Sequence, residues 1–502
     1  MKKICFLAII LVCLTASANA SSITVTDTIL KNTEWNSDTV FILKHIAVDT
    51  GITLTIKPGT RVLFGTHCAI WVQGTIVAEG SAADSIYFTA LDTSAGWRGI
   101  RYHWPDSGND LSSFSYCDFS YGKADTNSNL GWDNNGGALY FNNFLNGNSQ
   151  MAYIRNCTFH HNSADGSGGA LYCVNRANVR AVDCVFFRNN SALSGGAIAV
   201  NHICKVYIEN CEIRNNSAAK NGGGVYIRSN DESKFINCII ADNMAAEGGG
   251  AGYIHFYSYP RFYNCTISNN TAGERGGAFY VFEFVKPRFS NTIIWNNSAP
   301  EGTQVWVYDP DSRPEFRFCV VEDGKKGIDG NGYAGKFDTV SVDDPEFVNM
   351  LKGNFSLSAK SPCVNAGTSV LENGFELPLK DIAGNKRINQ GIVDIGALEY
   401  TGTVETISRP LVDHKNHKIS CSKSGAGCIV IDLSAFTESK PLTNLTVDVF
   451  SLAGRLIYTL SRTSVYSHKL ELPGLNKYGS GIYFIELGDG HRHLGTFSFK
   501  MD

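Results

Sequence analysis

The stretch that decides the fold is Asn156-Cys157-Thr158-Phe159-His160-His161-Asn162, followed closely by Gly168-Gly169-Ala170-Leu171-Tyr172. Both blocks recur at an interval of 27 residues over at least five repeats. The cysteine column comprises Cys157, Cys184, Cys211, Cys238 and Cys265, and it continues through Thr292 and Cys319. The glycine column comprises Gly137, Gly169, Gly196, Gly223, Gly250 and Gly277. Two columns in phase over this length predict a solenoid of stacked coils.

Each repeat contains two short strand signals. One is a Gly-Gly turn before an apolar strand, and the other is an Asn-Cys-x-apolar strand that ends in a further Asn. The residue two positions after each column cysteine is apolar, and the period of two in a strand places it on the same face as the cysteine. We therefore expect these apolar residues to point inward: Phe159, Phe186, Ile213, Ile240 and Ile267.

The turns carry two further columns. Gly-Gly pairs suit a turn with positive φ before each strand. Asparagines after the cysteine strands should stack into a hydrogen-bonded ladder, namely Asn162, Asn190, Asn216, Asn243, Asn270 and Asn297. In this assignment Asn190 lies one residue late, which indicates a single-residue insertion in that coil.

These patterns predict an all-β protein, a right-handed parallel β-helix over residues 21–356 with coils from about residue 39, followed by a small C-terminal β-sandwich. Right-handedness follows from the rule for crossovers between parallel strands. Helical periodicity is missing between the strand signals, which excludes βαβ units. Apolar residues make up 43% of the 502, charged residues 18%, and there are 50 glycines, which suits a turn-rich β protein.

The stacked cysteines allow three interpretations. Neighbouring rungs lie about 4.8 Å apart, within the Cα range of a disulfide, and export would favour such bridges. The cysteines can also be small buried apolar groups, and Thr292 within the column favours that interpretation. A metal site is disfavoured because neither Cys-x-x-Cys spacing nor a histidine pair recurs with the column.

The repeats resemble those of polymorphic outer-membrane proteins, which carry Gly-Gly-Ala-apolar and Phe-x-x-Asn signatures. Phe159-His160-His161-Asn162 and Phe187-Arg188-Asn189-Asn190 match the second signature, and the resemblance covers roughly residues 136–297. It implies a β-helical surface passenger, often adhesive. That family usually ends in an autotransporter barrel, of which this sequence shows no sign.

The N-terminus is typical of a signal peptide over residues 1–20. Lys2 and Lys3 precede a short apolar segment, and Ala18 and Ala20 fit a small-x-small cleavage site. The formal net charge is −4, which gives no reason to expect nucleic acid as a partner. No transmembrane span is expected after signal removal, so we expect a secreted, extracellular or outer-membrane surface-anchored protein.

Three sequence blocks stand out in the segment 343–400. They are Ser-Pro-Cys-Val-Asn-Ala-Gly-Thr at 361–368, Asp-Ile-Ala-Gly-Asn-Lys-Arg at 381–387 and Val-Asp-Ile-Gly-Ala-Leu-Glu-Tyr at 393–400. These blocks resemble the choice-of-anchor domain, type Q, found at the end of secreted β-helices. Residues 357–400 are therefore expected to cap the last coil. Their Asp and Arg residues are expected to pair with one another and tie the loops down, the alternative being a binding site.

Residues 401–427 are polar and have no periodicity, which indicates a linker. Cys421 and Cys428 flank a short turn within reach of a local disulfide. Residues 428–502 show alternating strands and closely resemble the type IX secretion C-terminal sorting domain. The resemblance rests on a Gly-Arg turn, a Gly-Ile-Tyr-Phe strand and a late lysine, here Gly454, Arg455, Gly481, Tyr483 and Lys500. It implies the type IX secretion machinery as a partner.

Three functions remain open from sequence. The favoured one is a non-catalytic surface protein that binds polysaccharide or a cell-surface ligand. The alternative is a polysaccharide lyase or glycoside hydrolase, and the third is a structural spacer. Paired carboxylates suited to hydrolysis are not evident in the coils, so we assign no catalytic, cofactor or metal residue and expect no cofactor. One acidic column, Glu247, Glu274 and Glu301, is expected to project into water.

Overall fold

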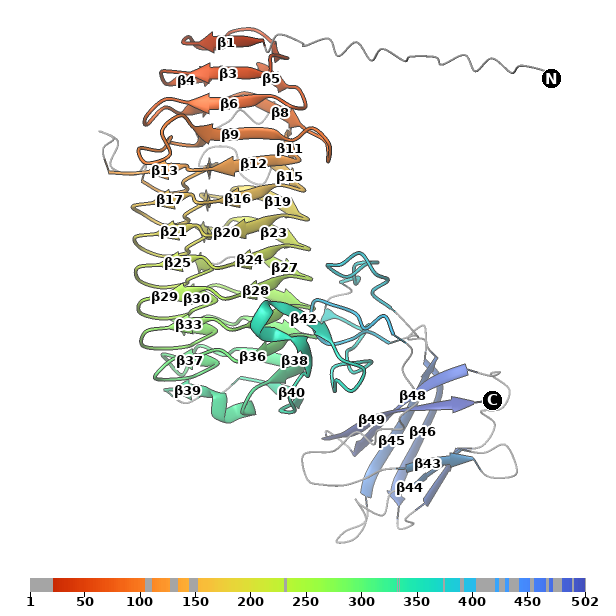
Figure 1. Ribbon diagram of the computed structural model, residues 1–502. Coiled ribbons are helices and arrows are strands. Elements are labelled where there is room, and N and C mark those ends of the chain that lie inside the picture. The colour runs from red at the N-terminus through yellow and green to blue at the C-terminus, as the bar shows by residue number, and fades with distance from the viewer. Residues whose placement is uncertain are drawn as a thin grey trace, which may run out of the picture.

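The computed structural model describes residues 21–103, 111–126, 134–143, 152–229, 233–331, 333, 335–372, 375–388, 392–402, 420–423, 429–432, 442–451, 456–465, 469–472, 481–489 and 492–501. From residue 22 to residue 341 the strands are parallel and stack coil upon coil into a right-handed solenoid (Figure 1). The fold predicted from the repeat is therefore confirmed. Three parallel sheets run along it, named A, B and C below.

Sheet A has 23 strands in two ladders. One ladder contains β1 (Ser22–Val25), β3 (Thr39–Ile42), β6 (Arg61–Phe64), β9 (Ile86–Ala90), β12 (Cys117–Ser120), β16 (Thr158–His160), β20 (Val185–Phe187), β24 (Glu212–Arg214), β28 (Ile239–Ala241), β32 (Thr266–Ser268) and β36 (Ile293–Trp295). The other contains β2 (Thr33–Trp35), β5 (Thr53–Ile56), β8 (Thr75–Glu79), β11 (Ser112–Ser115), β15 (Ala152–Arg155), β19 (Asn178–Val182), β23 (Lys205–Glu209), β27 (Lys234–Ile236), β31 (Arg261–Tyr263) and β35 (Arg288–Ser290). Both ladders end on β38 (Glu315–Val321), which pairs with β40 (Phe337–Ser341).

Sheet B has 11 strands: β4 (Ile46–Val48), β7 (Ile70–Val72), β10 (Ile100–His103), β14 (Leu139–Asn142), β18 (Leu171–Val174), β22 (Ile198–Asn201), β26 (Val225–Arg228), β30 (Gly252–His255), β34 (Phe279–Phe282), β37 (Val305–Val307) and β39 (Ile328–Gly330). Sheet C has six: β13 (Lys123–Ala124), β17 (Ser163–Ala164), β21 (Asn190–Ser191), β25 (Ser217–Ala218), β29 (Met244–Ala245) and β33 (Thr271–Ala272). A short 3-10 helix, η1 (Gly324–Gly327), precedes β39.

The interior consists of stacked like residues, as the 27-residue period predicts. The predicted inward residues are all fully buried in one continuous core. Phe159 stacks on Phe186 with ring centroids 4.6 Å apart, and Ile213, Ile240 and Ile267 continue the column. Stacked rings and branched chains exclude water along the whole axis, so the core behaves as one hydrophobic rod.

A buried asparagine ladder lines one interior turn, with one correction to the sequence assignment. The second member is Asn189, which is buried, whereas Asn190 is exposed on β21. Asn162 Nδ2 donates to Asn189 Oδ1 over 3.0 Å, and each later amide donates to the next coil in the same way, ending at Gln304. The predicted insertion is therefore wrong, and the coil keeps its 27-residue spacing. The ladder satisfies amides that would be costly to bury unpaired.

The two glycines of each pair have different roles. Positive φ belongs to the first, for example +68° at Gly222, and not to the column glycine that follows. The column glycine is required for close packing, because a Cβ at Gly196 would lie 2.1 Å from the Gly223 carbonyl oxygen of the next coil. The predicted positive-φ turn is therefore present at each Gly-Gly pair. The residue with positive φ is the first glycine of the pair, one position before the column glycine.

The cysteine column stacks as predicted, and its described thiols are free and buried. The Cys184 amide lies 3.4 Å from Cys211 Sγ, and Cys117, which the sequence pattern did not include, joins the column above Cys157. Burial raises the pKa of Cys319 to about 12, so its thiol is neutral. The structure supports the packing interpretation. A pair between Cys421 and Cys428 lies outside the described residues.

We expect a thiol-specific reagent to label the column cysteines only after denaturation, without reductant, because they pack as small apolar groups. Peptide mass spectrometry of the labelled chain would check this. Replacement of Cys211 by Ala should cost about 1 kcal/mol or less, since it removes one small buried group. A mass corresponding to a bridge between Cys157 and Cys184 would contradict the packing interpretation.

The solenoid begins earlier and ends earlier than expected. β1 pairs in parallel with β3, so stacking starts at residue 22 and not near residue 39. The last parallel strand is β40, which ends at Ser341. Residues beyond it leave the stack and form an antiparallel pair, β41 (Phe347–Asn349) and β42 (Asn354–Leu357), joined by the 3-10 helix η2 (Met350–Lys352).

Residues 343–402, named the flank segment here, lie along the side of the solenoid and not over its end as predicted (Figure 1). Phe355 and Ala397 pack on Ile239 and Ala241 of β28. Arg214 of β24 donates both Nη atoms to the Gly353 carbonyl at 3.1 and 3.0 Å. The flank segment packs at this place because the outward residues of β28 are apolar, and burying them removes their surface from water.

The C-terminal strands form two antiparallel sheets, as predicted for a β-sandwich. One contains β43 (Ser420–Lys423), β44 (Ile429–Asp432) and β47 (Lys469–Leu472), and the other β45 (Leu442–Ser451), β46 (Leu456–Val465), β48 (Gly481–Asp489) and β49 (Arg492–Met501). Since β43 pairs with β44, the described strands of the sandwich include residues 420–423, which lie within the range predicted as a linker.

Candidate functional site

The outer face of sheet B carries a column of large side chains along the solenoid axis, interrupted at Ala199. Alternation along each strand points its neighbours inward and this column outward. Neighbouring rings stack, with Tyr140 and Tyr172 centroids 5.5 Å apart and Tyr253 and Tyr280 centroids 5.1 Å apart. In register, the column contains Trp71, Arg101, Tyr140, Tyr172, Ala199, Tyr226, Tyr253, Tyr280 and Trp306.

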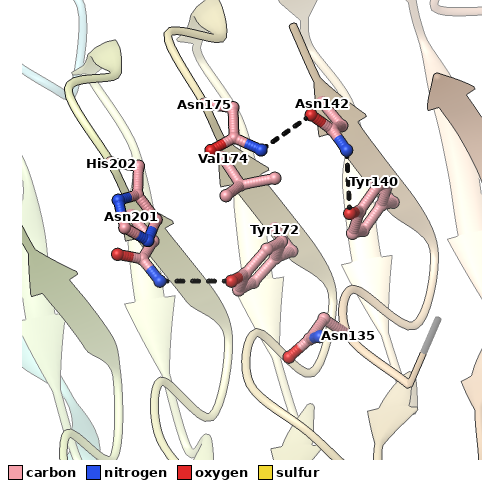
Figure 2. Close-up of a pocket in the computed structure, with 8 residues that line it drawn as sticks. All are labelled: Asn135, Tyr140, Asn142, Tyr172, Val174, Asn175, Asn201 and His202. Atoms are coloured by element: carbon pink, nitrogen blue, oxygen red, sulfur yellow. Dashed lines mark hydrogen bonds between the residues drawn. The ribbon is translucent and has the colours of Figure 1, made fainter. Parts of the chain in front are cut away.

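A pocket of about 340 Å³ lies beside this column (Figure 2), where Asn142, Asn175 and Asn201 lie at one end of the tyrosine rings and Asn135 lies at the other end. Its lining is Asn135, Tyr140, Asn142, Tyr172, Val174, Asn175, Asn201 and His202. Asn201 Nδ2 donates to the Tyr172 hydroxyl over 3.4 Å, and Asn175 Nδ2 donates to Asn142 Oδ1 over 3.0 Å. Because each amide has two donors and an acceptor with two lone pairs, the rim suits a ligand rich in hydroxyl groups.

A second pocket of about 420 Å³ shares His202 with the first. Its lining adds Ile203, Ser229, Phe256, Tyr257 and Tyr259. We name the two pockets together the sheet B groove. It follows the axis from the coil of β14 to the coil of β30, four rungs or roughly 19 Å at the usual strand spacing.

Exposed aromatic rings border the second pocket. Phe256 is 39% exposed, Tyr257 42% and Phe284 43%. The Tyr257 and Phe284 rings stack at 5.1 Å, one coil apart. Large aromatic side chains are seldom left in water in a row, and exposed apolar patches of this kind mark binding surfaces.

The backbone beneath these rings is strained. Ile203, Phe256, Tyr257 and Phe284 have φ of +58°, +52°, +52° and +59°. Bulky residues in the left-handed region are uncommon and cost of order 1–3 kcal/mol each. Glycine or asparagine would relieve the strain at these turns. Retaining large rings there favours a binding function for the side chains.

The polar side chains that line the two pockets are amides, hydroxyls and His202, and one cation, Arg228, and one carboxylate, Glu283, lie near the second pocket. Burial, and then the positive charge of Arg228, lowers the pKa of His202. Burial also lowers the pKa of His255, which interacts with Glu283 over 3.0 Å. Arg228 lies over the Phe256 ring at 5.6 Å. Near pH 7 the histidines therefore offer hydrogen bonds and not charge.

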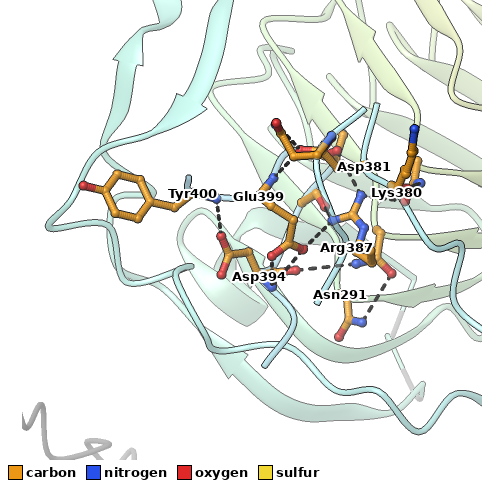
Figure 3. A network of polar contacts seen from close by, with 12 residues as sticks. Asn291, Lys380, Asp381, Arg387, Asp394, Glu399 and Tyr400 are labelled. Atoms are coloured by element: carbon orange, nitrogen blue, oxygen red, sulfur yellow. Dashed lines mark hydrogen bonds and ion pairs between the residues drawn. The ribbon is translucent and has the colours of Figure 1, made fainter. Parts of the chain in front are cut away.

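A second polar cluster lies between the flank segment and sheet A (Figure 3). Arg387 Nη1 donates to Glu399 Oε1 over 2.8 Å, and both side chains are fully buried. Arg387 Nη2 donates to Asn237 Oδ1 over 2.6 Å, so the cluster reaches across to β27 and its turn. Asp394 accepts from the Asn365 and Tyr400 amides at 2.6 Å each. The predicted pairing between the Asp and Arg residues of this segment is not what the described contacts show, because Arg387 pairs with Glu399 and Asp394 accepts from backbone amides. The network nevertheless ties the segment down, and it clamps the segment to the solenoid.

The clamp continues along one column of turn asparagines. Asn237 donates to the Lys380 carbonyl, Asn264 to that of Asp394 and Asn291 to that of Thr368.

Burial raises the pKa of Glu399 to about 8 and that of Asp394 to about 6. A buried carboxylate needs its partner, so Arg387 holds this interface together.

The sorting residues lie partly within the described strands. Gly481 pairs with Met501, Tyr483 with Phe499 and Lys500 with Ile482, so three of them share the β48–β49 pair. Gly454 and Arg455 lie outside the described residues, as do Ala18 and Ala20 of the predicted cleavage site. The strand pairing does not test whether these residues act in sorting or in signal cleavage.

The acidic column has ordinary surface contacts. Glu301 pairs with Arg275 at 2.8 Å, and Glu247 accepts from Asn221 Nδ2 over 3.0 Å.

In the described part of the chain, no three His, Cys, Asp or Glu side chains gather as a metal site would need. Of the helices described, none has the length and apolar character to span a membrane.

Sequence analysis missed the sheet B groove. The signal was present, because Tyr172, Tyr226, Tyr253 and Tyr280 keep the 27-residue period directly after the Gly-Gly turns. Their outward orientation follows from the inward position of the preceding apolar residue. The turn aromatics Phe256 and Phe284 lack such a column, so only the structure places them beside the tyrosines.

Comparisons with known proteins agree with the fold. Residues 191–342 match the right-handed β-helix region family. Residues 156–174 match the repeat of the Chlamydia polymorphic membrane protein, a family that points to outer-membrane or surface proteins. No curated protein matches the chain. The chain is therefore a right-handed parallel β-helix with a repeat similar to those of polymorphic membrane proteins.

Proposed function

We propose that this protein is a secreted or cell-surface, non-catalytic β-helix that binds polysaccharide in the sheet B groove. The observation that carries the proposal is the groove itself, where amides lie at both ends of the tyrosine rings, beside exposed, strained aromatics. Sugars present hydroxyl groups at the edge and C–H groups on the face of each ring, which suits amide rims and aromatic walls.

The alternative, a lyase or glycoside hydrolase, is less well supported. Glycosidases need two carboxyl groups across the bond that is cleaved. The residues that line the two pockets are amides, aromatics, His202 and small or apolar residues. Their chemistry supports binding and not hydrolysis.

Replacing Tyr257 by Ala should weaken polysaccharide binding about 5- to 150-fold, because stacking on an exposed ring contributes of order 1–3 kcal/mol to such sites. The mature protein would first be screened on a polysaccharide array, and affinity for the best ligand then measured by calorimetry. Met244, 57% exposed on sheet C, gives the matched control Met244→Ala, with unchanged binding expected. Equal loss in both variants, or no ligand on the array, would contradict the proposal.

We further propose export by type IX secretion through the C-terminal sandwich, with attachment or release afterwards. The support is the resemblance at Gly481, Tyr483 and Lys500, which the sandwich brings into one strand pair. The flank segment, which resembles a choice-of-anchor domain, packs along the side of the solenoid and precedes the described strands of this sandwich, the first of which begins at Ser420.

Deleting residues 403–502 should leave a folded β-helix in the periplasm, because the deletion removes the whole sandwich and leaves the Arg387 clamp intact. Cell fractionation and protease shaving would locate the protein. The main thermal transition should match that of the full chain. Surface display of the truncated chain would refute the export proposal, and failure to fold would refute the domain boundary.

A further inference from the structure

Two neighbouring histidines on the outer face of sheet A converge on one point. His160 ends β16 and His161 follows it with φ of +54°. Consecutive side chains of a strand face opposite sides, but the left-handed turn brings the second imidazole beside the first. The two Nδ1 atoms lie 2.8 Å apart. The equivalent pair in the next coil is Phe187 and Arg188, so this arrangement belongs to one coil.

A carboxylate fixes the orientation of the first ring. His160 Nε2 lies 3.2 Å from Asp118 Oδ2 on β12. With Nε2–H donated to Asp118, which is the tautomer that this contact assigns, His160 Nδ1 accepts a hydrogen bond from His161 Nδ1–H. A metal ion bound to both Nδ1 atoms takes the place of this proton, and His161 then carries its proton on Nε2. A histidine that binds a metal commonly donates its other ring N–H to a carboxylate in this way.

Aromatic rings hold both imidazoles in place. The His160 ring stacks on Phe187 with centroids 5.1 Å apart, and the His161 ring stacks on Tyr121 with centroids 5.4 Å apart. The two nitrogen atoms are therefore held near one another before any ligand binds, which reduces the entropy lost on binding.

We propose that His160 and His161 form a binding site for a divalent transition-metal ion, Ni²⁺ or Cu²⁺. With metal–nitrogen bonds of about 2.05 Å, a 2.8 Å separation gives an N–metal–N angle of about 86°. That angle suits adjacent positions of an octahedral or tetragonal ion better than a tetrahedral ion such as Zn²⁺. Water would fill the other positions, and Asp118 would act through His160 as a positioning residue.

The surrounding charges act in both directions. Asp118 supplies the negative charge, whereas Arg188 on the next coil opposes a bound cation. The groups that face the pair are thus Asp118 and Tyr121 from one coil and Phe187 and Arg188 from the other.

The test is calorimetric titration of the mature chain with Ni²⁺, and electron paramagnetic resonance with Cu²⁺. We expect one ion per chain and a spectrum with two coupled nitrogens. His160→Phe and His161→Phe should each weaken binding at least tenfold, and Asp118→Asn should weaken it about 10- to 100-fold. Arg188→Gln should tighten it.

His45→Phe, at an exposed histidine near the N-terminal end of the solenoid, is the matched control and should leave metal affinity unchanged. Circular dichroism would verify that each variant is folded. Wild-type affinity equal to that of His160→Phe, or a loss of the same size in His45→Phe, would overturn the site. Unchanged affinity in Asp118→Asn would overturn the positioning role of Asp118.

Discussion

Replacing Ile240 with Asp should prevent the solenoid from folding at room temperature. Ile240 is fully buried, stacked between Ile213 and Ile267 in the middle of the core. A carboxylate there has no partner and must be buried charged or take up a proton, at a cost of more than about 4 kcal/mol. Because each coil contacts only its neighbours, a fault in the middle also separates the two halves of the stack.

The matched control is Ile240→Val, which removes one methylene group and should cost about 1 kcal/mol. Chemical denaturation followed by circular dichroism would compare the two variants with the unaltered chain. An Asp variant that unfolds at the same denaturant concentration as the unaltered chain would show that Ile240 does not lie in the core.

Replacing Arg387 with Ala should cost about 3–5 kcal/mol at pH above about 8, where Glu399 is ionised and is left buried without a partner. We expect the loss to appear first as release of the flank segment. The turn asparagine Asn237 would also lose its donor. Limited proteolysis within residues 343–402, measured together with thermal unfolding, would separate release of the segment from unfolding of the solenoid.

The loss should grow with pH. Burial already raises the pKa of Glu399 to about 8, well above that of an unfolded glutamate. A carboxyl group with a raised folded pKa contributes its stability below the unfolded pKa and loses it as pH rises toward the folded pKa. Without Arg387 the folded pKa rises further, so the variant should be closer to the unaltered chain at pH 4.5 than at pH 8.

A double variant, Arg387→Met with Glu399→Leu, provides the control. Replacing both charges with apolar groups of similar size removes the buried charge, so most of the stability should return. A double variant as unstable as Arg387→Ala would show that the clamp depends on packing or on Asn237 and not on the ion pair.

The fold could be predicted from the sequence because, in a stack of coils, residues of the same type recur at a constant interval along the chain. The cysteine, glycine and apolar columns each report the same 27-residue coil, so they specify strand register without any tertiary information. The error at Asn190 arose because Asn189 and Asn190 are the same residue type. Only the positions of neighbouring strands show that Asn189 points inward.

The flank segment and the groove were beyond sequence reasoning for different reasons. The contact between Arg387 and Asn237 joins residues 150 positions apart, and no local pattern encodes it. The tyrosine column, which forms one part of the groove, can be recognised in the sequence because its tyrosines keep the 27-residue period. The other part depends on turn residues such as Phe256, which are placed by backbone geometry at each coil.

The most direct test of the account is hydrogen–deuterium exchange of the mature chain with and without its polysaccharide ligand. We predict new protection confined to the segments that form the sheet B groove, around residues 134–143, 171–176, 198–203, 226–229 and 253–259. Exchange along the flank segment and in the C-terminal sandwich should not change. Protection at the flank segment with none along sheet B would contradict the central claim that this face of the β-helix binds the ligand.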